Sequence, residues 1–322
     1  MIRMRALPLA ILAAAFATAA AAQEITLKAV SSFAEGTKDS LGFEALVKDI
    51  NAKGAGKIRI NYLGGAPKVM NPFEVVKNLK EGVVDMANAN SAFFTNVVPE
   101  ADAFKLSEYS IAELRKNGGW EYMNKILNEK ANAYFLGNAL ENITFNIYLN
   151  KPIEKADLKG LKIRVTPIYR AMVEALGGTA VTSPPAEVYT LMERNTVDGF
   201  GWPTAGIFDY SWEKVTKYRV EPAFYSAALH ALVNLAAWNK LGPERQKIMQ
   251  GAMAEQEKKL ADRVALNDAE RKRQADAGIK TIQLPPAEAK KWSDTAKDAG
   301  WAAVIKVSPE QGAKLKELLT KK

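Results

Sequence analysis

The chain of 322 residues contains no cysteine and only one histidine, His230. Without cysteine it has no disulfide, no thiolate metal ligand and no lipid-attachment cysteine. One histidine excludes metal sites built on two histidines, and a Ser-His-Asp triad would have to use His230, which we interpret as a structural residue of an apolar strand. The sequence also lacks the G-x-S-x-G, Walker A and G-x-G-x-x-G motifs. We therefore predict no catalytic residue, no cofactor and no metal requirement.

Long apolar runs are missing after the N-terminus, since no later stretch avoids charge for long enough to span a bilayer. Residues 1–22 combine two arginines, an apolar stretch and three alanines ahead of Gln23, as a secretory signal does. A retained membrane anchor is the alternative, but the apolar stretch is short and is interrupted by Pro8. We expect cleavage after residue 22 and a free, soluble, exported protein.

The charge has no strong local concentration, although the formal net charge is +8. Dense basic spots occur only at 270–273 and at the last two residues. A nucleic-acid-binding arm would need a longer basic run, so we predict no nucleic-acid partner. The positive balance is compatible with an anionic ligand.

One segment of the sequence occurs twice, because residues 72–85 return without a gap as residues 185–198. Each copy opens with proline at a helix start, and each helix ends at a residue suited to the left-handed cap, Gly82 or Asn195. The repeat predicts two similar α/β lobes that face a cleft. The alternative is convergence, since strand-helix-strand units are common in open α/β sheets.

A basic strand and a pair of glycines precede each copy of the repeat. We match residues 57–60 with residues 162–165, which places Arg59 opposite Arg164. The repeat also pairs Asp85 with Asp198. These two carboxylates are candidates for acid/base work, but their equivalent positions favour a duplicated structural task, which we expect to be fixing the turn after each strand.

The chain is expected to cross between the lobes in the 140s and again near 227–230. This divides it into a first lobe of residues 23–145 plus about 229–270 and a second lobe of residues 146–228 plus about 271–322. A long charged helix is predicted to start at Gly242-Pro243 and to run to about Ala277.

Three segments of the second half carry a family resemblance. They are the motif Leu-Lys-Gly-Leu-Lys-Ile-Arg-Val at 158–165, residues 187–190, and Val-Asp-Gly at 197–199. The chain strongly resembles the solute-binding proteins of tripartite ATP-independent periplasmic (TRAP) transporters, the DctP type. Matches at 82–86, 150–153 and 239–241 extend the resemblance over essentially the whole mature chain.

The resemblance implies a periplasmic α/β protein with two lobes of the type II-like binding-protein fold. Each lobe would be a mixed sheet flanked by helices, with a long helix spanning the lobes. Such a protein binds a small organic acid and delivers it to the membrane permease of the TRAP transporter. We expect a monomer.

Arg164 is the main candidate for ligand binding. An arginine in a strand is by itself more often a solvated surface residue, but the resemblance implies that Arg164 clamps the ligand carboxylate. Many relatives carry a second arginine where this chain has Asn146, which suggests fewer anionic contacts. We therefore expect a monocarboxylate, namely a hydroxy, oxo or ring-bearing acid.

Aromatic and amide side chains complete the predicted site. The aromatic candidates offer an apolar wall for a ring or a short hydrocarbon, although each of them is as well suited to core packing. The amide and hydroxyl candidates would hydrogen-bond a hydroxyl or oxo group. The full set of ligand-binding candidates beside Arg164 is Phe33, Asn90, Ser91, Asn146, Tyr148, Phe200 and Trp202.

Two other functions stay open at this point. One is an exported enzyme acting on an anionic metabolite through Asp198, Glu187 or His230. The other is a binding protein that reports to a membrane sensor kinase.

Overall fold

The computed structural model describes residues 23–321, apart from the side chains of residues 261–264. The predicted signal, residues 1–22, lies outside these residues, so its cleavage stays a prediction. None of the described helices is both long enough and apolar enough to cross a membrane.

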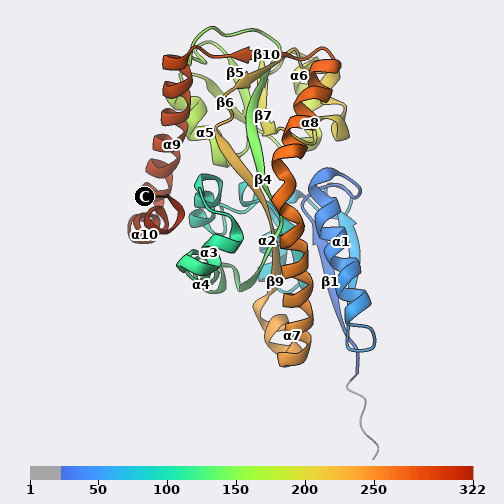
Figure 1. Ribbon diagram of the computed structural model, residues 1–322. Helices are drawn as coiled ribbons and strands as arrows, with labels where there is room; N and C mark the ends of the chain where they lie inside the picture. Colours follow the sequence, from blue (N-terminus) through green and yellow to red (C-terminus); the bar gives the residue numbers. More distant parts are fainter. Residues whose placement is uncertain (1–22, 322) are drawn as a thin grey trace, which may run out of the picture.

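The architecture is a mixed α/β fold around one sheet (Figure 1), whose strands follow the order β2-β1-β3-β9-β4-β7-β5-β6, with β8 attached to β4 and β10 to β8. The strands are β1 (Ile25–Ser31), β2 (Ile58–Gly65), β3 (Met86–Ala89), β4 (Ala133–Leu149), β5 (Lys162–Val165), β6 (Thr179–Thr182), β7 (Gly199–Pro203), β8 (Tyr218–Glu221), β9 (Tyr225–Asn234) and β10 (Lys280–Gln283).

Helices cover both halves of this sheet. The α-helices are α1 (Lys38–Lys53), α2 (Val75–Lys80), α3 (Ile111–Asn117), α4 (Gly119–Ala131), α5 (Pro167–Ala175), α6 (Val188–Glu193), α7 (Leu235–Lys258), α8 (Arg263–Asp276), α9 (Pro286–Val307) and α10 (Pro309–Leu319). The short 3-10 helices are η1 (Pro72–Glu74), η2 (Ser91–Phe93), η3 (Pro99–Leu106), η4 (Pro185–Glu187), η5 (Ile207–Tyr210), η6 (Trp212–Val215) and η7 (Lys259–Asp262).

Two long antiparallel strands, β4 and β9, connect the halves (Figure 1). On one side of them β1 pairs in parallel with β2 and β3, and on the other side β5 pairs in parallel with β6 and β7. The predicted two-lobed α/β class is confirmed. The sheets of the two lobes are continuous, because β4 has 17 residues and reaches through both.

The sequence repeat corresponds to a structural repeat. The order β1-α1-β2-α2-β3 in the first half returns as β5-α5-β6-α6-β7 in the second, and each repeated segment forms a 3-10 turn followed by a six-residue helix. Gly82 and Asn195 both follow these helices with positive φ, of 75° and 53° respectively. The predicted left-handed caps are therefore present in both copies.

Asp85 and Asp198 have the same structural task in the two halves. The Asp85 carboxylate accepts a hydrogen bond of 2.8 Å from the backbone N–H of Lys28, and Asp198 accepts one of 2.9 Å from Lys162. Each aspartate stands before a strand, β3 or β7, and ties it to the neighbouring strand, β1 or β5. The two aspartates share a structural task, as expected. Each of them stands ahead of its strand, however, and does not fix a turn after it.

This equivalence corrects the match between Arg59 and Arg164. Arg164 stands two residues after Lys162, so its counterpart is Val30, two residues after Lys28, and β5 corresponds to β1. Arg59 belongs to β2 and is exposed. The basic strands and glycine pairs resemble each other in composition, but the strand order shows that they occupy different places in the two halves.

The helices after β9 join the halves. Gly242, with φ of 71°, interrupts α7, and the chain then stays helical through η7 into α8, as predicted for the long helix (Figure 1). Helix α9 packs against α5 of the second half and η3 of the first, whereas α10 packs against η3, α3 and α4. This differs from the expected grouping of 271–322 with the second lobe. The apolar side of a terminal helix does not specify which half will cover it.

Candidate functional site

A small cavity lies between the two halves, where the ends of β3, β5 and β7 meet. Its walls include Phe33 and Asn90 from the first half and Thr166, Ile168 and Trp202 from the second. About 20 Å³ is open to the centres of water molecules, which is room for about one water. The lining is mainly apolar with a few polar groups, as in sites that bind small organic molecules.

A second, larger cavity adjoins the first. It offers about 300 Å³ to the centres of water molecules and is also lined from both halves, by Asn71 from the first and by Pro184, Glu187 and Tyr210 from the second. Phe33 lines both cavities. Its ring is therefore the boundary between them.

Arg164 is completely buried at the carboxyl end of β5. Its guanidinium donates hydrogen bonds to the Ser183 carbonyl, to the Tyr169 hydroxyl at 3.2 Å and more weakly to the Ser183 hydroxyl at 3.4 Å. It forms no ion pair with a carboxylate anywhere in the described part of the chain. Burial lowers the pKa of Arg164 below its ordinary value, although neighbouring groups such as Tyr169 oppose this.

Arg164 is not among the residues that line either cavity, but some of its neighbours are. Its Cζ atom is 5.9 Å from the centre of the Trp202 ring, which lines the smaller cavity. Its partner Ser183 directly precedes Pro184, which lines the larger one. The charge of Glu187 acts on Arg164, but a buried positive charge without a carboxylate bonded to it is costly. This arginine is therefore suited to neutralisation by an anion that enters between the halves.

Three of the predicted residues line the smaller cavity. Trp202 is 4% exposed, and its ring meets that of Trp212 edge-on, with the centres 4.8 Å apart. Phe33 packs edge-on against Phe93. Asn90 caps η2 through its side-chain oxygen, and its amide donates to the Ala228 carbonyl at 2.8 Å. The hydrogen-bonding groups of Asn90 are therefore already engaged within the protein.

Five predicted residues do not line this cavity, namely Arg164 and the four that follow. Ser91 is buried at the start of η2 and does not line the cavity. Tyr148 and Phe200 stack on each other in the core with ring centres 5.1 Å apart. Asn146 is fully buried, donates to the Val220 carbonyl and accepts from the Thr204 hydroxyl, both at 2.8 Å.

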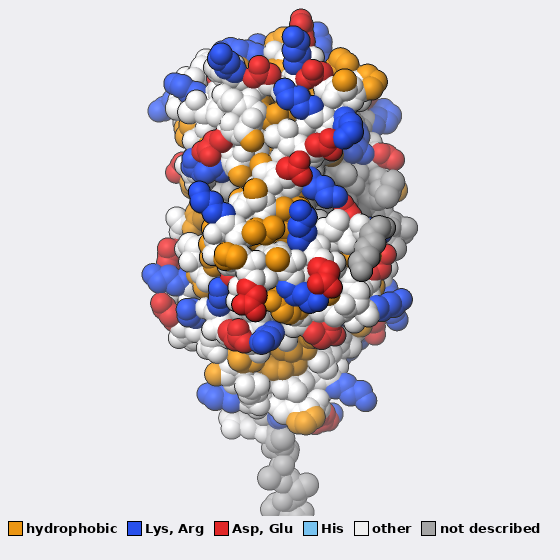
Figure 2. Space-filling model, turned by 90° about the vertical axis from the view of Figure 1, so that its left-hand side faces the viewer, with side chains coloured by type: hydrophobic (Ala, Val, Ile, Leu, Met, Phe, Trp, Pro, Cys, Tyr) orange, Lys and Arg blue, Asp and Glu red, His pale blue; other side chains and the backbone are white. Residues whose placement is uncertain are grey.

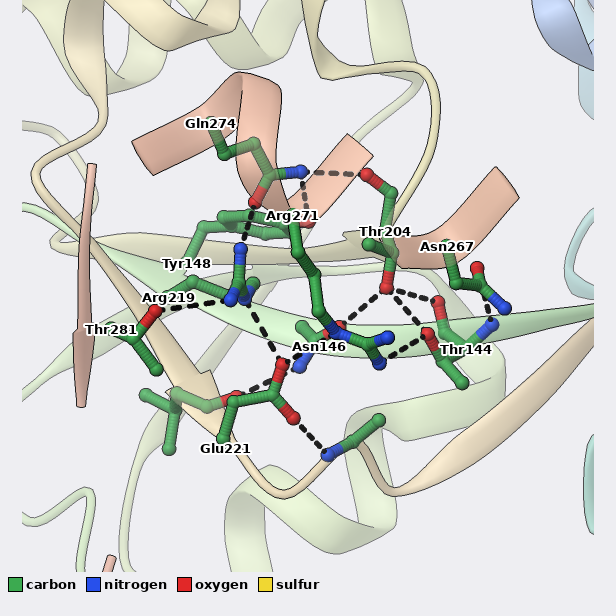
Figure 3. A network of polar contacts seen from close by, with 12 residues as sticks. Thr144, Asn146, Tyr148, Thr204, Arg219, Glu221, Asn267, Arg271, Gln274 and Thr281 are labelled. Atoms are coloured by element: carbon green, nitrogen blue, oxygen red, sulfur yellow. Dashed lines mark hydrogen bonds and ion pairs between the residues drawn. The ribbon is translucent and has the colours of Figure 1, made fainter. Parts of the chain in front are cut away.

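Asn146 and Tyr148 belong to a buried polar network that holds α8 against β4 and β8 (Figure 3). Its centre is Gln274, which donates to the Thr204 carbonyl at 2.6 Å and to the Tyr148 hydroxyl at 3.2 Å. The same side chain accepts a hydrogen bond from Arg219 at 2.7 Å. Because α8 covers this face of the sheet, these predicted residues stabilise the fold.

His230 is a buried structural residue. Its Nδ1 atom hydrogen-bonds Asn138 at 2.9 Å, and its ring centre is 4.0 Å from that of Phe104. Burial lowers the pKa of His230 to about 3, so the ring is neutral at physiological pH. Among residues 23–321, leaving aside 261–264, no cluster of three metal-ligating side chains is placed to hold an ion.

Asp39, the second residue of α1, also lines the smaller cavity and is not predicted from the sequence. Asp39 is 4% exposed, and its pKa is raised to about 7, first by burial and then by the charge of Asp209. An acidic residue in the first turn of a helix is common, because it favours the positive end of the helix dipole. Nothing in the sequence distinguishes this aspartate from such a residue.

The outer surface shows mixed charge. On the face that carries α9, basic and acidic side chains are interspersed with small apolar patches (Figure 2). No extended basic stripe of the kind that tracks a nucleic-acid backbone is visible on this face.

Comparison with known proteins identifies the family. Residues 29–304 match the bacterial extracellular solute-binding protein family 7, named DctP. The chain therefore belongs to the DctP family, which confirms the resemblance to TRAP solute-binding proteins. These are binding proteins and not enzymes, so the enzyme alternative is set aside.

Individual relatives have low sequence identity to this chain. The chain is 25% identical over 228 residues to a monocarboxylate 2-oxoacid-binding periplasmic protein of Nostoc, and this match covers 67% of the chain but 61% of that protein. It shares the fold of a TRAP periplasmic solute-binding protein of Desulfovibrio salexigens with bound orotic acid, at 20% identity and a TM-score of 0.82, with coverage of 91% and 97%. A Bordetella pertussis solute receptor that binds pyroglutamic acid has 17% identity and a TM-score of 0.79, with coverage of 92% and 99%.

Proposed function

We propose that this protein binds a small organic monocarboxylate in the periplasm and delivers it to the membrane subunits of a TRAP transporter. The observation that supports this most directly is Arg164. Its guanidinium is completely buried beside Trp202, which lines the smaller cavity, and its hydrogen bonds go to neutral oxygen atoms. A carboxylate is the anion whose two oxygens match the planar fork of arginine.

The surroundings of Arg164 support a particular kind of acid. Trp202 is close to Arg164, and together with Phe33 and Ile168 it gives the smaller cavity an apolar surface that suits a short hydrocarbon or a ring. Asn146 is engaged by Thr204 and Val220, so it does not replace the second arginine of many relatives. One charged clamp with apolar walls favours one carboxylate over two.

Closure of the two halves strengthens this contact. The larger cavity has walls from both halves, so a ligand there would hold them together. Exclusion of water lowers the effective dielectric constant around the ion pair. The closed form would then present the surface that the permease recognises.

The direct test is Arg164→Lys, because lysine keeps the positive charge but lacks the planar pair of donors. We expect affinity for the bound acid to fall about 30- to 150-fold, or about 2 to 3 kcal/mol. The acid can be identified by native mass spectrometry of the freshly purified protein. The dissociation constants are then compared by isothermal titration calorimetry.

Arg170→Lys is the matched control. Arg170 stands six positions further along the chain, but its side chain is 43% exposed and pairs with Glu174. Its replacement should leave affinity nearly unchanged. Equal losses in both variants would indicate a diffuse basic surface, and an unchanged affinity in Arg164→Lys would remove the clamp from the proposal.

A further inference from the structure

Two residues that line the smaller cavity each carry a buried polar atom that has no partner among the described residues. The Oδ2 atom of Asp39 and the Nε1 atom of Trp202 are both buried, and neither has a hydrogen-bond partner among the described residues. Both side chains are 4% exposed, and both line the same cavity. Trp120, Trp292 and Trp301 also have buried Nε1 atoms without a partner, but Trp202 has an unsatisfied acceptor as its neighbour.

The two atoms converge beside Gly206. A Cβ atom built on this glycine would lie 3.1 Å from Trp202 Nε1 and 3.5 Å from Asp39 Oδ2. Gly206 has φ of 111°, a conformation that residues with a side chain rarely adopt. The indole N–H and the carboxylate therefore lie near the same glycine and near each other.

The chemistry of the pair restricts which ligand group could satisfy both atoms. The indole N–H only donates, and an ionised carboxylate only accepts. A hydroxyl group can do both, because it accepts from Trp202 and donates to Asp39. A keto oxygen would satisfy Trp202 but would face the carboxylate with a second acceptor, and an ammonium group would satisfy Asp39 but not Trp202.

We propose that Asp39 and Trp202 form a hydroxyl-recognition site, so that the ligand is a hydroxy acid whose carboxylate lies at Arg164. This inference rests on the proposed function and narrows its ligand class. The spacing is consistent with a small acid, since the Trp202 ring is 5.9 Å from the Arg164 guanidinium carbon. Phe33 and Ile168 line the same cavity with apolar surface that excludes competing water.

The experiment compares matched acids at pH 8, above the pKa of about 7 for Asp39. The probes are butyrate, its 2-, 3- and 4-hydroxy derivatives and 2-oxobutyrate, together with phenylacetate, mandelate and phenylglyoxylate as a ring-bearing set. Calorimetry gives each dissociation constant. We expect at least one hydroxy acid to bind about 10-fold or more tightly than both its unsubstituted and its oxo counterpart.

Two variants test the assigned atoms. Trp202→Phe removes the N–H but keeps an aromatic ring, and Asp39→Asn keeps the shape but replaces the carboxylate. Each should reduce the ratio of the affinity for the hydroxy acid to the affinity for the unsubstituted acid by about 5-fold or more. A general loss of packing would weaken all acids together, so the ratio of affinities separates recognition from structural damage.

The outcomes distinguish a failure of the hydroxyl-recognition site from a failure of the proposed carboxylate binding. If hydroxy, oxo and unsubstituted acids bind equally well, or if the oxo acid is preferred, the hydroxyl site is wrong while carboxylate binding stands. An unchanged preference in both variants also overturns it. If no acid of either set binds, the proposed carboxylate function fails, and this inference fails with it.

Discussion

At the residue scale, two buried titratable side chains have pKa values displaced in opposite senses. Burial raises the pKa of Asp39 to about 7 from its ordinary 3.8, and lowers the pKa of His230 to about 3 from its ordinary 6.5. Both displacements disfavour the charged form, as desolvation does. Their effects on stability therefore run in opposite directions with pH.

We predict that Asp39→Asn stabilises the protein increasingly as pH rises. Between pH 3.8 and about 7 the native state holds a proton on Asp39 that the unfolded chain releases, so the wild-type free energy of unfolding falls as pH rises. Asparagine cannot ionise, and the variant should be more stable by about 2 to 4 kcal/mol at pH 8. Urea unfolding from pH 4 to pH 8 measures the difference.

The charged neighbours of Asp39 are part of this prediction. The charge of Asp209 raises its pKa further, and the charge of Lys38 opposes this. Tyr210 also lies within the field of Asp39. His230 makes the opposite contribution, with stability lost as pH falls from 6.5 to about 3, and this cancels when variant and wild type are compared. If the difference in the free energy of unfolding between variant and wild type does not vary with pH, burial does not raise the pKa of Asp39.

At the element scale, the position of α8 depends on a few buried polar contacts. Gln274 links this helix to the Thr204 carbonyl, the Tyr148 hydroxyl and the Arg219 guanidinium (Figure 3). Arg219 is 4% exposed and also binds Glu221 at 3.1 Å. Such networks are costly to disturb, because each partner left behind is buried.

Gln274→Leu should therefore destabilise the protein strongly although leucine has a similar size. It leaves an Arg219 donor and the Thr204 carbonyl without their partner, and we expect a loss of about 2 to 4 kcal/mol in the free energy of unfolding. Lys272→Met on the same helix is the control, since that side chain is 76% exposed. Chemical denaturation should show less than about 0.5 kcal/mol for the control. Similar losses for both variants would contradict the role given to the network.

At the scale of the whole molecule, the start of α1 bridges the two halves. The backbone N–H of Lys38 donates to the Asp209 carboxylate of η5 at 2.7 Å, and its side chain pairs with Glu270 of α8. Helix α1 packs on β2 and α7, whereas η5 and α8 belong with the second half. These contacts favour the closed arrangement of the halves.

We predict that Lys38→Met shifts the ligand-free protein towards an open form. The apparent affinity for ligand should fall about 2- to 10-fold, because a smaller fraction of molecules is closed. Small-angle X-ray scattering should show a larger radius of gyration without ligand and the wild-type value with saturating ligand. Lys53→Met is the control, since Lys53 pairs with Glu255 inside the first half. A radius that changes equally in both variants would show that the bridge does not govern closure.

The sequence predicted part of the site because some of its residues occupy strand ends. Arg164 follows from its motif, and Phe33, Asn90 and Trp202 all line the cavity between the halves. Tyr148 and Phe200 are directly paired across β4 and β7, further from the cleft. There α8 covers the sheet, and the sequence of a strand does not say which helix will cover it.

The sequence by itself determined the family, the two α/β halves and Arg164 as the candidate arginine, because these depend on local motifs and on an ungapped repeat. The tertiary structure alone decided that Val30 is the counterpart of Arg164, since this follows from hydrogen bonds between strands distant in sequence. It also brought Asp39 beside Trp202, residues 163 positions apart along the chain. Their meeting depends on how the two halves close on each other, and no local pattern encodes that distance.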